Sequence, residues 1–241
     1  MKKLLKKLIK LIITLGILFS IGVWGLGYRE YKQVISENPI ETSIQNVKNK
    51  DLYSTYDEIP SLFLDAIVSV EDERFWVRNG TVDFEALIRA TAVNIINLEL
   101  VQGGSTIPQQ VSKNLYFENS ASLIRKVSEY FVTRDLLKVS SKQEILELYV
   151  NMIYYGNGAY SIKEASLNYF NIYPWQLNEG ELVILAGLPQ APSIYDLTQN
   201  YDLAKQRQHH VLDRMVANGV LTEEQAHEIF IMEVRNYEKN D

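Results

Sequence analysis

The sequence of 241 residues contains no cysteine, and this absence excludes several kinds of site. A chain without cysteine forms no disulfide, offers no thiolate nucleophile and binds no metal through sulfur. Its three histidines, His209, His210 and His227, have no carboxylates at ligand spacing, so we expect them at the surface and not around a metal. There is also no Walker loop, no Ser-His-Asp order and no internal repeat. Function must therefore rest on carboxylate, amide, hydroxyl and cationic side chains.

Strand-like alternation of apolar and polar residues is missing as well, whereas apolar residues recur at helical spacing along much of the chain. Hydrophobic residues make up 46% of the sequence and charged residues 22%, which is ordinary for a globular protein and excludes a mostly disordered chain. The length suits one domain of about 200 residues with an appendage. The sequence therefore predicts a mostly α-helical fold.

Positive charge is scarce outside the first ten residues, which hold five lysines. No acidic residue precedes Glu30, so the remaining 19 basic residues stand against 30 acidic ones, a net charge of −11 for residues 29–241. A surface this acidic repels the phosphates of nucleic acids, so we expect no nucleic-acid partner. Recognition of a phosphate would need a local cluster of cations.

One long uncharged run, residues 11–28, follows the basic segment 1–10 and is close to the length that spans a bilayer. A cleaved signal peptide is the alternative, but the run is long for that purpose and residues 24–28 form a poor cleavage site. We therefore expect an uncleaved anchor with its N-terminus in the cytoplasm. The polar residues 29–59 are interpreted as a stalk or linker, and residues 60–235 as a domain outside the membrane.

An acidic pair, Glu71 and Asp72, follows a predicted helix that begins at Pro60-Ser61 and places apolar residues at helical spacing up to Val70. A carboxylate at the C-terminal end of a helix gains nothing from the helix dipole. The pair is therefore a candidate for function, with a solvated acidic helix end as the alternative.

Asp83 is a candidate N-cap for the next helix, which has a broad apolar stripe. Arg89 lies among the apolar residues of this stripe. The helix leads into the apolar stretch 95–101. This stretch would be either buried core or a segment that enters the membrane interface beside a lipid substrate, and periodicity alone does not choose between the two.

A glycine pair, Gly103-Gly104, precedes a predicted helix start with the form of a capping box, Thr106 and Gln109. Proline at 108 falls in the first turn, where its missing N–H costs little. Gln109, Gln110 and Lys113 share a helix face near this N-terminus. The pattern predicts an anion site, although most glycine pairs are simply turns.

Ser122 is a candidate cap for a further helix, in which Arg125, Lys126 and Glu129 lie within one turn. Taken alone, this cluster would be an ordinary surface ion pair. Glu147, on a later buried helix, is interpreted as a structural partner and not as a catalyst.

Five short motifs follow one another between residues 59 and 230. They are Glu71-Asp72-x-x-Phe75, Gly103 to Asn114, Arg125-Lys126-x-x-Glu129, Lys142 to Asn151 with Ile153-Tyr154-Tyr155-Gly156, and Leu188-Pro189-Gln190-Ala191-Pro192-Ser193. In this order they resemble the motifs of the peptidoglycan glycosyltransferases, the family of bifunctional class A penicillin-binding proteins and of monofunctional transglycosylases. The absence of SxxK and KTG elements leads us to expect no transpeptidase domain.

The resemblance implies a mostly helical, lysozyme-like domain that polymerises lipid II at the outer face of the cytoplasmic membrane. The 4-hydroxyl of a new lipid II would attack the anomeric carbon of the growing glycan chain, with inversion and release of undecaprenyl diphosphate. By similarity, Glu71 would be the general base. Glu129 would assist the leaving group, directly or by holding a divalent cation such as Mg²⁺ or Mn²⁺.

The residues expected to bind the substrate carry amide, hydroxyl and charged groups that suit a sugar diphosphate. They are Asp72, Arg89, Ser105, Gln109, Gln110, Lys113, Arg125 and Lys126. The expected partners are lipid II, the growing glycan chain, the cytoplasmic membrane and other cell-wall synthases.

The chain departs from the family pattern beside Glu71, where residues 76–83 lack the usual histidine and hold one extra residue. Proline at 108 replaces a threonine, Ser161 and Asn171 replace glycines, and Leu137 stands at an often acidic position. Two alternatives therefore stay open: a lysozyme-like glycan hydrolase, or a degenerate scaffold in a cell-wall complex.

Overall fold

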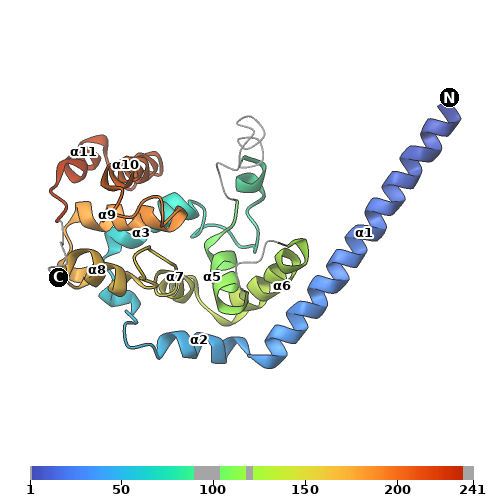
Figure 1. The fold of residues 1–241 in the computed structure, drawn as a ribbon, viewed down its shortest axis with the longest axis horizontal. Coiled ribbons are helices and arrows are strands. Elements are labelled where there is room, and N and C mark those ends of the chain that lie inside the picture. Colours follow the sequence, from blue (N-terminus) through green and yellow to red (C-terminus); the bar gives the residue numbers. More distant parts are fainter. Residues whose placement is uncertain (1, 90–103, 118–121, 236–241) are drawn as a thin grey trace.

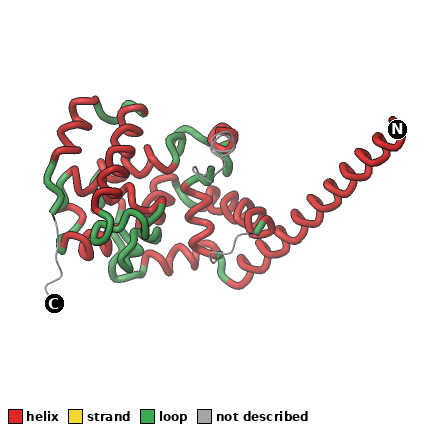
Figure 2. Tube along the Cα trace, turned by 45° about the horizontal axis from the view of Figure 1, so that its top comes forward, coloured by secondary structure: helices red, strands yellow, loops and turns green. Residues whose placement is uncertain are grey.

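The structure, a computed structural model, describes residues 2–89, 104–117 and 122–235. Over these ranges the chain consists of helices and loops, with no β-strand (Figure 2). The prediction of a mostly α-helical fold is confirmed. Its α-helices are α1 (Lys2–Glu37), α2 (Ile40–Lys48), α3 (Ser61–Glu71), α5 (Ile107–Tyr116), α6 (Leu123–Val139), α7 (Lys142–Val150), α8 (Ile162–Phe170), α9 (Glu179–Gly187), α10 (Tyr201–Ala217) and α11 (Glu223–Ile231), with 3-10 turns at Tyr56–Glu58, Pro174–Gln176 and Leu188–Gln190. Residues 84–89 are helical as well.

Polar side chains cap the starts of these helices, among them Thr106 and Ser122 as the sequence predicts. Thr106, Ser122, Ser141 and Asn178 each accept a hydrogen bond from the backbone N–H three residues on. Ser161, in place of a family glycine, caps α8 in the same way. The helix boundaries therefore follow from local sequence.

The core forms where α9 is enclosed by α3, α10 and α11. Every residue of α9 from 180 to 187 is buried, and the apolar face of α3 is buried against it. Helices α5, α6 and α7 form a second packed group (Figure 1). Because α3 belongs to the first group and ends beside α5, the C-terminal end of α3 lies where the two groups meet.

Helix α1 projects from the domain as a long rod, and its last turns run along α6 (Figure 1). Its apolar side chains between Leu4 and Leu26 are exposed, and by length and composition it is long and apolar enough to cross a membrane. Trp24 and Tyr28 meet Phe131 of α6 edge-on, at ring-centroid distances of 5.6 and 5.2 Å. The predicted apolar anchor is thus one continuous helix with a segment that packs on the domain.

Residues 29–59, for which the sequence predicts a stalk or linker, are largely helical and packed. They include the end of α1 and all of α2, whose Ile40, Ile44 and Val47 join the main core. Glu147 accepts a hydrogen bond from the backbone N–H of Tyr56 at 2.8 Å, which confirms its structural role. The segment is not an extended tether, because its apolar residues are spaced at helical intervals and are buried together.

We predict that Gly27→Ala loosens α1 from α6. A Cβ at Gly27 would lie 2.6 Å from Val127 Cβ and 2.9 Å from the Ile124 carbonyl oxygen, so the helices must move apart. Overpacking of this kind costs about 1–3 kcal/mol. Thermal unfolding in detergent should show a lower melting temperature, whereas Gly25→Ala, with no atom within 4 Å, should not lower it. Equal melting temperatures for the two variants would contradict this packing.

Candidate active site

Glu71, the last residue of α3, meets α5 directly. Burial of Phe63 and Ile67 holds α3 in the core and brings its final residue beside α5. Gln110 Nε2 then donates a hydrogen bond of 2.9 Å to Glu71 Oε2. The structure therefore brings together residues from the first and the second motif.

Three buried polar side chains lie within electrostatic reach of Glu71: Tyr149 of α7, Tyr155, and Arg207 of α10. Burial, together with the nearby Glu71 charge, raises the pKa of both tyrosine hydroxyls well above its usual value. Burial lowers the pKa of the Arg207 guanidinium, and the Glu71 carboxylate opposes that shift. The Glu71 carboxylate therefore has one cation, Arg207, and two neutral hydroxyls, those of Tyr149 and Tyr155, in its surroundings.

The site residues predicted from the sequence do not include these three. Tyr149 lies within the fourth motif, yet its spacing is that of an ordinary buried helix position. Its hydroxyl is fully buried and lies beside the Glu71 carboxylate. Arg207 belongs to none of the motifs, so only the packing of α10 against α3 brings it to Glu71.

Glu129 lies on α6 at the centre of a cluster of cations. Its side chain is 1% exposed, and its Oε2 accepts a hydrogen bond of 2.7 Å from Lys126 Nζ. Lys126 Nζ also donates to Ser105 Oγ at 3.1 Å, which links the third motif to the residues just before α5. Arg125 Nε is 3.5 Å from Glu129 Oε1. The predicted grouping of Ser105, Arg125, Lys126 and Glu129 is therefore present in the structure.

Two buried atoms of this cluster, Arg125 Nε and Glu129 Oε1, have no hydrogen-bond partner among the described residues. The two atoms form the ion pair of 3.5 Å with each other, so neither lacks a charged partner. Within the described ranges, no three His, Asp or Glu side chains come close enough to hold a metal ion. The described residues therefore offer such a cation at most two of these side chains as ligands at Glu129.

The N-terminus of α5, predicted as an anion site, is already saturated by the protein. The N–H of Ile107 donates to Asp72 Oδ2 at 3.0 Å, and Thr106 and Gln109 bond each other in a capping box. Proline at 108 has no N–H to offer. The backbone N–H groups at this N-terminus are therefore occupied by the chain itself. The predicted anion site rests on the side chains of Gln109, Gln110 and Lys113, and it stays a prediction.

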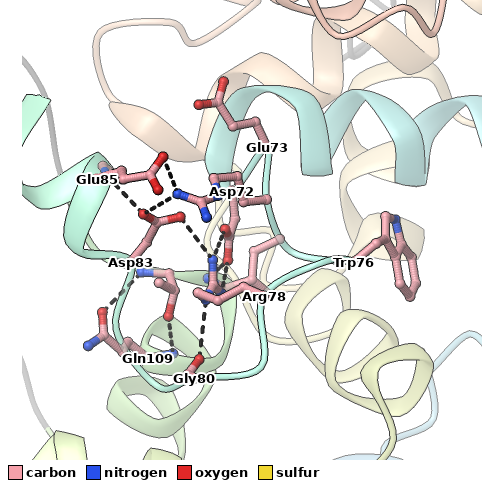
Figure 3. A network of polar contacts seen from close by, with 12 residues as sticks. Asp72, Glu73, Trp76, Arg78, Gly80, Asp83, Glu85 and Gln109 are labelled. Atoms are coloured by element: carbon pink, nitrogen blue, oxygen red, sulfur yellow. Dashed lines mark hydrogen bonds and ion pairs between the residues drawn. The ribbon is translucent and has the colours of Figure 1, made fainter.

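Three side chains predicted to bind substrate make structural contacts instead of facing a ligand. Asp72 is buried and paired with Arg78, and the Gln109 side chain accepts a hydrogen bond from Thr106 N (Figure 3). Arg89 Nη1 lies 2.7 Å from Glu73 Oε1. Their role in binding stays a prediction. Lys113 is half-buried on α5 and has no ion pair with a described residue. Gly103 and the stretch 95–101 lie outside the described residues.

Glu71 and the cations of α6 thus both lie beside the start of α5. Glu71 is bonded to Gln110 in the first turns of the helix, and Lys126 is bonded to Ser105 just before it. The model for the transglycosylase family matches residues 36–216, three quarters of the chain. This chain belongs to the transglycosylase family. This is the family whose motifs the five sequence motifs resemble.

Relatives of this transglycosylase include both short and long proteins. It is 41% identical to a protein of Cupriavidus necator named as a transglycosylase, over 69% of this chain and 71% of that protein. It is 40% identical to penicillin-binding protein 1A of Aquifex aeolicus and 37% identical to that of Escherichia coli K12, over 74% and 71% of this chain. The chain spans only 24% and 20% of those two proteins.

We predict opposite effects for two neighbouring glutamines of the transglycosylase. Gln109→Ala removes the capping box of α5 and should lower the free energy of unfolding by about 1 kcal/mol. Gln110→Ala removes the donor to Glu71 and should lower glycan polymerisation with little effect on stability. Thermal unfolding and turnover measured on both variants test this, and a stability loss confined to Gln110→Ala would contradict it.

Proposed function

We propose that the chain polymerises lipid II into β-1,4-linked glycan strands and releases undecaprenyl diphosphate. Membership of the transglycosylase family supports glycosyl transfer. The observation that carries the finer assignment is that a carboxylate and a cation both contact the start of α5: Gln110 bonds Glu71, and Lys126 bonds Ser105 just before the helix. Proton removal and departure of an anion are the two events that this reaction needs.

On the acceptor side, Glu71 removes the proton from the sugar 4-hydroxyl of the incoming lipid II. The freed oxygen attacks the anomeric carbon of the growing chain, and the bond from that carbon to the diphosphate oxygen breaks with inversion. Glu71 suits this role because it is a partly exposed carboxylate that the hydrogen bond from Gln110 holds in place.

On the donor side, Arg125, Lys126 and Lys113 stabilise the diphosphate as its negative charge develops, with Ser105 as a hydroxyl donor. Lys126 is 46% exposed at its side chain, so it can turn from Glu129 to a ligand. A glycan hydrolase does not release a multiply charged group and has no need of these cations. The cluster therefore favours transfer from a diphosphate carrier.

Glu129 assists the leaving group either through its cations or by holding Mg²⁺ or Mn²⁺. Its Oε1 lies 3.5 Å from Arg125 Nε with no hydrogen bond to a described residue, and it is the carboxylate atom that such a cation would contact. A divalent cation would neutralise charge on the diphosphate.

The substrate's polyprenyl chain lies in the bilayer, and α1 supplies the means to keep the domain beside it. We propose that the five lysines at the N-terminus remain in the cytoplasm and the domain lies outside, where other cell-wall synthases would act on the same strands.

Substitution of the base should abolish turnover without unfolding the protein. Glu71→Gln keeps the shape of the side chain but cannot accept the proton, so polymerisation should fall at least about 100-fold. The assay incubates the purified full chain with lipid II and a divalent cation, and quantifies glycan polymer and undecaprenyl diphosphate.

Glu85→Gln is the matched control, because Glu85 is an exposed carboxylate beyond the same motif. It should retain wild-type turnover. Full activity of Glu71→Gln would exclude the mechanism, new reducing ends without undecaprenyl diphosphate would indicate a hydrolase, and substrate binding without turnover in the wild type would indicate a scaffold.

A further inference from the structure

Arg78 is a buried cation in a surface loop. Its side chain is 8% exposed, although its neighbour Val77 is 74% exposed. It lies in the stretch 76–83, where the chain departs from the family pattern. An arginine is seldom buried unless it is paired, so its partners indicate what the loop does.

The guanidinium of Arg78 holds Asp72 through two parallel contacts. Nη1 lies 2.5 Å from Oδ1 and Nη2 lies 2.7 Å from Oδ2 (Figure 3). Nη1 is also 3.5 Å from Asp83 Oδ2, and Nε donates to the Gly80 carbonyl at 3.2 Å. This bidentate geometry fixes the orientation of the Asp72 carboxylate as well as its charge.

Asp72 transmits that orientation to α5. Its Oδ2 accepts the hydrogen bond from Ile107 N, the first N–H of the helix, where the helix dipole favours a negative charge. Three residues further on, Gln110 donates to Glu71. Glu71 and Asp72 are adjacent in the chain, and their contacts with Gln110 and Ile107 lie about one turn apart on α5. Together these two contacts fix the position of α5 along its axis and its rotation about that axis, relative to the end of α3.

The loop that carries Arg78 is itself braced by α7. Lys142 Nζ donates to the Trp76 carbonyl at 2.6 Å and to the Arg78 carbonyl at 2.8 Å. Burial lowers the pKa of the Lys142 ammonium, and the Arg78 charge acts in the same direction. The backbone of Arg78 is thus held from α7 while its side chain holds Asp72.

We propose that Arg78 is a positioning residue, which keeps Gln110 and Glu71 aligned for proton transfer through Asp72 and α5. This rests on the proposed function, since Glu71 is the base there. Arg78 itself does not touch the substrate. Lysine cannot replace it, because an ammonium cannot form the paired contacts of a guanidinium.

The first test compares Arg78→Lys with Arg74→Lys, a matched control in the same loop. Arg74 is 38% exposed and pairs with Glu85 and, at 3.6 Å, with Asp83. Arg78→Lys should lower kcat for lipid II polymerisation at least tenfold and leave KM within twofold, because the loss falls on the chemical step. Arg74→Lys should match the wild type. A rise in KM with unchanged kcat for Arg78→Lys would overturn the proposal.

Rescue separates the guanidinium group from general damage to the fold. Guanidinium ion should restore part of the kcat of Arg78→Ala, whereas equal concentrations of sodium ion should not, and Arg74→Ala should not respond. Absence of rescue in an Arg78→Ala protein that retains the wild-type circular dichroism would count against a positioning role.

Amide hydrogen exchange tests the same contact without any substrate. Exchange in the peptide covering residues 104–116 should quicken in Arg78→Lys and stay at the wild-type rate in Arg74→Lys. If the wild type does not polymerise lipid II but this difference appears, the proposed function fails and the hold on α5 stands. If α5 exchanges alike in both variants, the positioning proposal fails, whatever the activity.

Discussion

The carboxylate of Asp72 lies at the N-terminus of α5, and the geometry around Glu71 depends on it. It accepts the first N–H of the helix and is neutralised by the guanidinium of Arg78. A buried carboxylate is stable only with such partners, so the loop, the end of α3 and the start of α5 form one unit. Because of this arrangement, the backbone N–H groups at the start of α5 are not available to a substrate. An anion bound here would be recognised by side chains.

Those side chains form a local exception in an acidic protein. Residues 29–241 carry a net charge of −11, yet Arg125 and Lys126 converge on the buried Glu129. Close contacts in a partly dehydrated site outweigh distant repulsion that solvent screens. Under the proposed function, these cations would meet the diphosphate of the substrate while polyanions are repelled from most of the surface.

Helix α6, which carries these cations, also packs against the apolar helix α1. Trp24, Gly27 and Tyr28 pack on α6 a few residues from Glu129. The position of the cations relative to the anchor is thus determined by helix packing and not by the length of a flexible linker. For a substrate whose lipid chain stays in the bilayer, this packing restricts how far the site can lie from the membrane surface.

Local sequence was sufficient for most of the helices, because caps such as Thr106, Ser122 and Asn178 and the helical spacing of apolar residues act within a few residues. The motifs likewise identified Glu71, Gln110, Lys126 and Glu129 as a group, and family membership agrees with them. Only the tertiary structure places Arg207 near Glu71. It also pairs Asp72 with Arg78 and with the first N–H of α5. It also buried the segment predicted as a stalk. These outcomes depend on contacts between residues far apart in the chain, and local propensity carries no information about which of two competing partners a buried charge will meet.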